Sequence, residues 1–251
     1  MSKYYESFQR LDRERDLLAP TRTPLIRLKQ GKPRLKLGGA ARMEVTRLVH
    51  RLFVTPQGMA PKVVLFAGIN ATSGCTFVAA HACDILAAKH AASVCLVDAN
   101  FRAPSLHERF GVSNECGLAD LVLDPRRSLD SVVRNVGNEG LWLLSSGSWV
   151  PNVEELTQSE QMTQRIAELR ARFEYVVIDT SPASEYPDAT ALAGAADGVV
   201  LVIRADTTRR DTTLDVQAQF EAAHAQVLGA VLSQRSYPIP ESIYARLSQV
   251  F

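Results

Sequence analysis

The sequence predicts an α/β protein with a doubly wound, mostly parallel sheet and an N-terminal helical and basic extension. Three observations support this fold class. Short apolar runs alternate with stretches of helical length across residues 52–251, which is typical of a parallel sheet covered by helices on both faces. Two of these runs end in a carboxylate, at Asp98 and Asp179. A third run, at 63–67, leads through a loop containing Gly74 into a helical stretch.

The individual elements follow from the spacing of apolar residues. An amphipathic helix is expected at 2–18, where Tyr5, Phe8 and Leu11 share one stripe. A second helix is expected at 41–54. Strands are expected near 63–67, 94–97, 141–144, 175–179, 198–203 and 227–232, and helices near 76–89, 153–172, 188–194 and 208–224. We therefore divide the chain into an extension, residues 1–51, and a sheet domain, residues 52–251.

The loop after the first strand matches a phosphate-binding loop only in part. In the form G-x-x-x-x-G-K-[ST], backbone N–H groups and a helix N-terminus hold the phosphates, the lysine reaches the β/γ oxygens and the hydroxyl holds magnesium. Gly74 and Thr76 fit this form, but Cys75 stands at the lysine position. Gly68 lies one place before the position of the first glycine. The sequence predicts a P-loop NTPase-like site that lacks its main cation.

Two strand-end carboxylates are expected to complete this site. Ligands of doubly wound sheets bind at the carboxyl ends of the strands, so Thr76, Asp98 and Asp179 should converge on one crevice. A hydroxyl and two carboxylates suit a magnesium–phosphate site. The alternative, in which the two aspartates only cap the ends of their strands, stays open.

The motifs that follow make the chain resemble the cytoplasmic domain of bacterial tyrosine autokinases (BY-kinases) of capsule and exopolysaccharide synthesis. That family is a branch of the deviant P-loop ATPases related to MinD and ParA. Residues 97–104, Val-Asp-Ala-Asn-Phe-Arg-Ala-Pro, are similar to its V-D-x-D-x-R-x-P motif. The other similar stretches are 107–111, 117–121, 144–147, 151–156, 197–204 and 229–232. The order of these fragments, more than any one of them, carries the resemblance.

The resemblance implies a role for each matching residue. Asp98, Asp179 and Arg102 would be catalytic, and Thr76, Asp98 and Asp179 would hold magnesium. The nucleotide would lie against Ser73, Gly74, Cys75, Thr76, Asn100 and Arg204.

Several positions depart from the family pattern. Asn70 stands where deviant loops carry another lysine, and Asn100 replaces the second carboxylate of the 97–104 motif. Ser233 stands where the family often has an adenine-side asparagine, and the C-terminal tyrosines, Tyr237 and Tyr244, form no cluster. The sequence therefore predicts an impaired kinase-like protein in which binding of ATP or ADP with magnesium is weak or lost.

Charge is distributed unevenly along the chain. The net charge is +1, but residues 20–51 hold nine Lys or Arg side chains and a single acidic one, Glu44. The field of this stretch favours anionic lipid or an acidic neighbour; a solvated linker without a partner is the simpler alternative. Nucleic acid is not expected as a partner, because the rest of the chain is acidic and lacks interleaved aromatic and basic residues.

The helix expected at 41–54 carries Glu44, Arg47, His50 and Arg51. The spacing is similar to the family's E-x-x-R-x-x-R oligomerisation motif, which implies a homo-oligomer in which Glu44, Arg47 and Arg51 pair across subunits. The alternative is a pair within the helix between Glu44 and Arg47, which stabilises a helix by only a few tenths of a kcal/mol.

Three functions agree with these observations. The first is a regulatory or scaffolding partner of a polysaccharide co-polymerase, the chain-length-determinant membrane protein, held peripherally at the cytoplasmic face of the plasma membrane. The second is an active tyrosine kinase or ATPase with an unorthodox loop. The third is a MinD/ParA-like spatial-organisation ATPase, which the absence of both loop lysines disfavours. The composition, 46% hydrophobic and 22% charged without a transmembrane-length apolar run, suits a cytoplasmic domain.

Overall fold

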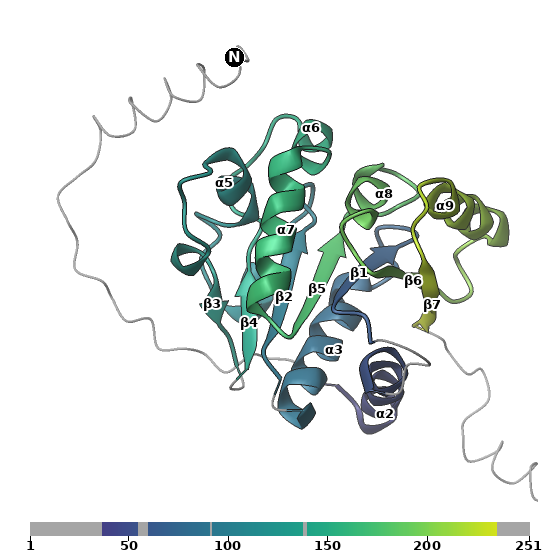
Figure 1. Ribbon diagram of the computed structural model, residues 1–251. Coiled ribbons are helices and arrows are strands. Elements are labelled where there is room, and N and C mark those ends of the chain that lie inside the picture. Colours follow the sequence, from purple (N-terminus) through teal and green to yellow (C-terminus); the bar gives the residue numbers. More distant parts are fainter. Residues whose placement is uncertain (1–36, 55–59, 91, 138–139, 235–251) are drawn as a thin grey trace, which may run out of the picture. The chain divides into compact units, whose positions relative to one another are not determined.

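A computed structural model describes residues 37–54, 60–90, 92–137 and 140–234 (Figure 1). The chain divides into a unit of residues 1–30 and a unit of residues 31–251, and all described residues belong to the second. The helix expected at 2–18 and most of the basic stretch lie outside the described residues. No helix among those described is long and apolar enough to cross a membrane.

The described unit is built on a seven-stranded sheet with the order β3-β4-β2-β5-β1-β6-β7. Its strands are β1 (Val63–Gly68), β2 (Val94–Ala99), β3 (Arg134–Asn135), β4 (Leu141–Leu144), β5 (Tyr175–Thr180), β6 (Gly198–Arg204) and β7 (Val227–Ser233). All neighbouring pairs are parallel except β3 and β4, which are antiparallel. The prediction of a doubly wound, mostly parallel sheet is confirmed. The two-residue β3 was not predicted, because it is too short to leave an apolar pattern.

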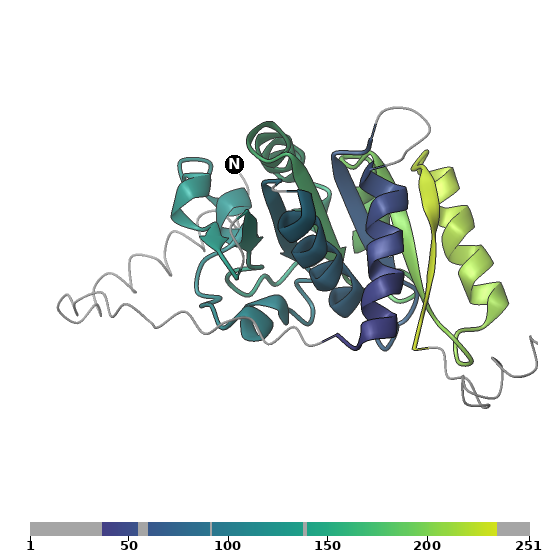
Figure 2. The ribbon, with the colours of Figure 1, turned by 90° about the horizontal axis from the view of Figure 1, so that it is seen from below.

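Helices cover both faces of the sheet, as Figures 1 and 2 show. On one face, Val63, Leu65 and Ala67 of β1 pack in a single core cluster with residues of five helices. These are α5 (Leu118–Leu123), α6 (Val153–Thr157), α7 (Glu160–Arg172), α8 (Asp188–Ala193) and α9 (Arg210–Ala222). This alternation of side chains explains why the central strands read as unbroken apolar runs.

The opposite face carries fewer helices. Val64 and Phe66 of β1 point into a second core cluster there. Its helical residues come from α2 (Gly39–Val49), the π-helical turn η1 (His50–Val54), α3 (Cys75–His90) and α4 (Leu106–Phe110). Figure 2 shows α2 and α3 lying side by side across this face. The phosphate-loop helix α3 and the short α4 thus share one layer.

The structure corrects several expected boundaries. The segment 153–172 is two helices, because Asn152 and Ser159 each accept a backbone N–H bond that starts a new helix. The helix expected at 41–54 begins at Gly39 and changes to π-helical geometry from His50. The short helices α4 and α5 and the 3₁₀ turn η2 (Leu129–Ser131) were not predicted.

Candidate nucleotide site

The loop between β1 and α3 turns sharply at the carboxyl edge of the sheet. Ser73 N donates to Asn70 O at 3.0 Å, and Gly74 has a φ of +76°, in the left-handed region that favours glycine. A Cβ added at Gly68 would lie 2.2 Å from Ser73 Oγ, so the strand end and the loop leave no room for a side chain. The loop presents the N-terminus of α3, whose free N–H groups and dipole favour an anion.

Asp98 and Asp179 lie next to each other at this edge. They are register partners at the ends of β2 and β5, and both are buried. Burial raises the pKa of Asp98 to about 6, against the effect of the backbone N–H groups that it accepts. Burial and then the charge of Asp98 raise the pKa of Asp179 to about 7. The predicted convergence of the two carboxyl groups is thus present, with pKa shifts of the kind found at functional sites.

The carboxyl group of Asp98 is occupied by the backbone that follows it. Its Oδ1 accepts from Asn100 N at 3.2 Å, and its Oδ2 accepts from Ser105 N at 3.2 Å and Leu106 N at 3.0 Å. These bonds fold the loop after β2 and satisfy N–H groups at the start of α4. These contacts agree with the capping alternative, and the predicted catalytic and metal-binding role of Asp98 stays a prediction.

Asp179 is different, because neither of its buried oxygens has a hydrogen-bond partner at normal geometry among the described residues. The side chains of Thr76 and Cys75 approach the carboxyl closely enough to lower its pKa. A buried carboxylate without partners is costly. Together with the Thr76 hydroxyl, it fits a magnesium ion that takes its other ligands from water and nucleotide phosphates. No cluster of three or more His, Cys, Asp or Glu residues is placed to hold a metal in the part of the chain that the structure describes.

Cys75, at the position of the missing lysine, is the first residue of α3 and is buried. Burial, followed by the charge of Asp179, raises the pKa of its thiol well above the ordinary value. The thiol is therefore neutral near pH 7 and contributes no positive charge to the loop. The helix N-terminus favours a thiolate, but desolvation beside a carboxylate outweighs that effect here.

Arg102 lies in the loop after β2 and is held by an acidic partner. Its Nε and Nη2 donate to the two carboxylate oxygens of Asp188 at 2.8 and 3.0 Å. Its guanidinium also stacks 3.9 Å from the ring centre of Tyr186 and lies 3.7 Å from Glu154. The guanidinium thus joins this loop to the start of α8, and its predicted catalytic role stays a prediction.

Asn70 stands at a lysine position of the family pattern and Asn100 at a carboxylate position, and both make local contacts. Asn100 Oδ1 accepts from Ala103 N at 3.1 Å and from Ser181 Oγ at 3.2 Å, which connects the loops after β2 and β5. Asn70 Oδ1 accepts from Thr208 Oγ1 at 3.1 Å. Neither side chain supplies the positive charge or the carboxylate that the family pattern has there.

The strand ends β6 and β7 lie beside the phosphate loop. Arg204 ends β6 opposite Ser233 of β7. Ser233 Oγ donates to Ser73 O, and Gln234 Nε2 donates to Thr72 O at 3.2 Å. The loop is therefore fastened by residues at the end of β7, among which sequence reasoning singled out only Ser233.

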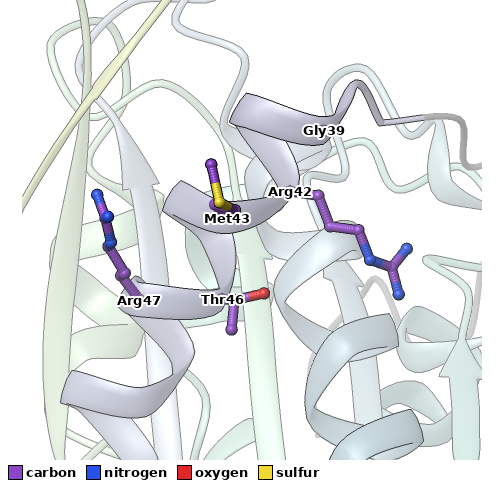
Figure 3. A pocket seen from close by; sticks show the side chains of 5 residues that line it. All are labelled: Gly39, Arg42, Met43, Thr46 and Arg47. Atoms are coloured by element: carbon purple, nitrogen blue, oxygen red, sulfur yellow. The ribbon is translucent and has the colours of Figure 1, made fainter.

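Of the proposed oligomerisation residues, Glu44 and Arg47 lie on the exposed side of α2 and Arg51 lies in η1. Arg47 Nη1 donates to Glu44 Oε1 at 2.6 Å, which is the pair within the helix that the sequence analysis left open. Arg51 is exposed. An open depression of about 400 Å³ lies along α2. Figure 3 labels the residues that line it: Gly39, Arg42, Met43, Thr46 and Arg47.

The structure thus brings most of the predicted site together. Ser73, Gly74, Cys75, Thr76, Asp98 and Asp179 meet at the carboxyl edge of β1, β2 and β5. Asp188 and Gln234 were missed, and so was Arg109, whose Nε is buried without a hydrogen-bond partner among the described residues. A strand-end pattern could not have found them, because they depend on how loops and a short helix pack.

Comparisons with known proteins agree with this arrangement. No protein-family model matches the chain. It is 30% identical over 149 residues to the tyrosine-protein kinase YwqD of Bacillus subtilis, a stretch that covers 59% of this chain and 62% of that protein. It is equally similar to the putative tyrosine-protein kinase CapB of Staphylococcus aureus, with 59% of this chain and 65% of CapB covered. The chain therefore spans less than two thirds of these relatives.

Solved structures show the same relationship. The kinase domain of VpsO superposes with a TM-score of 0.72 at 27% identity, covering 78% of this chain and 95% of that one. The kinase domain of Escherichia coli ETK gives a TM-score of 0.72 at 24% identity, covering 87% and 88%. MinD of Pyrococcus horikoshii, at 19% identity and a TM-score of 0.58 over 73% and 76% of the chains, shares the fold. The resemblance inferred from the motifs is confirmed: the homologues are bacterial tyrosine-protein kinases, on a P-loop fold of the MinD/ParA type.

Proposed function

We propose that this chain, a homologue of bacterial tyrosine-protein kinases, is a regulatory or scaffolding component of exopolysaccharide or capsule synthesis. In this proposal it binds ATP or ADP with magnesium weakly, and its kinase activity is reduced or absent. The observation that carries the proposal is Cys75, a buried and neutral thiol at the position where a phosphate loop has its lysine.

The missing lysine should affect nucleotide binding and catalysis to different extents. A hydrogen bond to a charged group is worth about 1.5–3 kcal/mol, so a missing lysine weakens triphosphate binding roughly 10- to 100-fold. Phosphoryl transfer relies on positioned charge around the migrating group, and losing one such contact typically costs about a hundredfold or more in rate. Catalysis should therefore suffer more than binding does.

The remaining residues support weak binding of a magnesium nucleotide. The phosphates would lie against Ser73, Gly74 and the N-terminus of α3, and magnesium would take Thr76 and Asp179 as ligands. A bound magnesium ion would neutralise phosphate charge. Asp98 would support the site indirectly, because its oxygens accept hydrogen bonds from the backbone of the loop that follows β2.

A scaffolding role also requires contacts with other proteins. We assign these to the 1–51 extension, including the exposed Glu44 and Arg47 of α2 and the exposed Arg51 of η1. The basic stretch would place the protein peripherally at the inner face of the plasma membrane, beside a chain-length-determinant membrane protein. The same helix would join subunits into a homo-oligomer.

An active kinase is the second candidate, favoured by the unpartnered oxygens of Asp179 beside Thr76. The test is to incubate the purified protein with magnesium and ATP and to search for phosphotyrosine by mass spectrometry. We expect none at Tyr237 or Tyr244. Phosphotyrosine at either residue that disappears in Asp179→Ala would establish the active kinase and overturn the regulatory proposal. A MinD/ParA-like role is less well supported, since the MinD likeness extends to the fold alone.

A further inference from the structure

Arg109 lies on α4, close to the first turn of α3. Leu106 and Phe110 of α4 are buried in the same core cluster as the residues of α3, so α4 is fixed against this face of the sheet. The Cζ atom of Arg109 lies 5.7 Å from the ring centre of Phe77. Phe77 directly follows Thr76 and is 37% exposed. The guanidinium therefore lies beside the first turn of α3, against the residue that follows the hydroxyl-bearing Thr76 in the chain.

The charge of Arg109 has no acidic partner within hydrogen-bond distance among the described residues. Its side chain makes no ion pair or hydrogen bond there, and its buried Nε lacks a partner. Arg102 provides the contrast, because both of its donors on that side are taken by Asp188. Leaving this buried Nε donor without a partner is unfavourable, and an anion or a water molecule would satisfy it.

The positive charge of Arg109 acts on two titratable groups near Phe77, Asp179 and His81. Burial and, to a smaller extent, the positive charge of Arg109 lower the pKa of His81, one helical turn further along α3. The same charge weakly opposes the burial that raises the pKa of Asp179 at the phosphate loop. His81 packs against Phe77, with 4.3 Å between the ring centres. Arg109 is thus a cation next to a phosphate loop that has lost its own.

From this arrangement we infer that Arg109 binds the terminal phosphates of a magnesium-bound nucleoside triphosphate in place of the missing lysine. A guanidinium suits this task, because its planar donors pair with phosphate oxygens in a bidentate manner. The inference rests on the proposed nucleotide site. It adds a phosphate ligand that comes from α4 and not from the loop itself.

The test compares two arginines that each lie over a phenylalanine ring. Arg172 Cζ is 5.8 Å from the ring centre of Phe173, just before β5 and at the edge of the sheet away from the phosphate loop. Arg109→Met and Arg172→Met each remove one positive charge and keep an apolar side chain over the ring. Binding of Mg–ATP, Mg–ADP and AMP would be measured by displacement of a fluorescent ATP analogue from each full-length protein. Arg109→Lys is included as the conservative variant.

We expect Arg109→Met to weaken Mg–ATP binding about 10-fold or more. Arg109→Lys should retain part of the affinity, and Arg172→Met should leave it unchanged. AMP, which lacks the terminal phosphates, should respond little to either change. Thermal unfolding without nucleotide shows whether each variant is folded. If Arg109→Met does not fold, the affinity of Arg109→Lys is compared with that of the native protein instead.

Equal Mg–ATP affinities for Arg109→Met and Arg172→Met would overturn the inference. It would also fail if the native chain bound no Mg–ATP while Cys75→Lys did, because Arg109 would then be unable to replace the lysine. A different outcome would contradict the proposed function alone. If Cys75→Lys does not raise the affinity for Mg–ATP but Arg109→Met lowers it, the proposal for Cys75 fails and the inference for Arg109 stands.

Discussion

Asp98 and Asp179 are register partners on β2 and β5, yet among the described residues only Asp98 accepts hydrogen bonds from backbone N–H groups, whereas the side chains of Thr76 and Cys75 approach Asp179. Two acids in equivalent positions therefore make different contacts. Asp98 holds the backbone of the loop that follows it. The carboxyl group of Asp179 faces the side chains of Thr76 and Cys75, beside the position where a magnesium ion would be bound.

Stability without metal should depend on pH chiefly through Asp179, with a smaller contribution from Asp98, whose pKa is about 6. The pKa of Asp179 is about 7 in the folded protein, against an ordinary value of 3.8. Between these values the folded state binds more protons than the unfolded state, so the free energy of unfolding falls as pH rises from about 4 to about 7. Asp179→Asn should remove much of this slope. Urea unfolding at a series of pH values in chelator measures it, and an unchanged slope in the variant would refute the assignment.

Asp98→Asn should lower the free energy of unfolding. An amide offers one acceptor oxygen and an NH₂ group, so it cannot accept the bonds from Asn100, Ser105 and Leu106 together. We expect a loss of roughly 1–3 kcal/mol, the cost of leaving a buried donor unsatisfied. Urea unfolding at pH 7 checks this. A variant as stable as the native protein would show that these bonds contribute little.

The pair between Arg102 and Asp188 should be structural. Asp188 is fully buried at the start of α8, and the Arg102 side chain is 27% exposed. Arg102→Gln would leave a buried carboxylate without its ion pair, which costs about 3 kcal/mol or more. Adding Asp188→Asn should recover part of that loss in a double-mutant cycle. Additive losses would mean that the two residues do not depend on each other.

The extension should act through charge. Removing residues 1–36 deletes most of the basic stretch and leaves α2, which begins at Gly39, intact. Exposed charges are screened beyond about 8 Å at physiological ionic strength, so attraction to an anionic surface should weaken as salt rises. Light scattering and sedimentation with anionic vesicles, at low and high salt, compare the two proteins. Identical assembly and vesicle binding at both salt concentrations would leave the extension without this role.

Sequence patterns predicted the central part of the fold well. The six longer strands and the α3 helix were expected because buried parallel strands read as apolar runs, and the edge that carries Asp98 and Asp179 follows from those strand ends. The segment 153–172 was taken as one helix, although Ser159 offers an N-cap signal inside it. Short elements such as α4 were missed because five residues hold too little periodicity to be recognised.

The chemistry of the site was less predictable than its location. The sequence placed Cys75 at the lysine position. It did not indicate that burial beside Asp179 keeps the thiol of Cys75 neutral. The sequence also did not show that the carboxyl groups of Asp98 and Asp179 have different partners, since both residues end similar strands. Arg109 carries no motif, and its closeness to Phe77 depends on the packing of α4 against α3.

The most direct test of the account is the affinity for Mg–ATP before and after a lysine is restored at position 75. Isothermal titration would compare the native chain, Cys75→Lys and the control Cys116→Lys, which adds the same charge at an exposed cysteine. We predict weak binding by the native chain, a gain of about 10-fold or more for Cys75→Lys and no gain for the control. Micromolar or tighter binding by the native chain, unchanged in Cys75→Lys, would contradict the claim that Cys75 impairs the site.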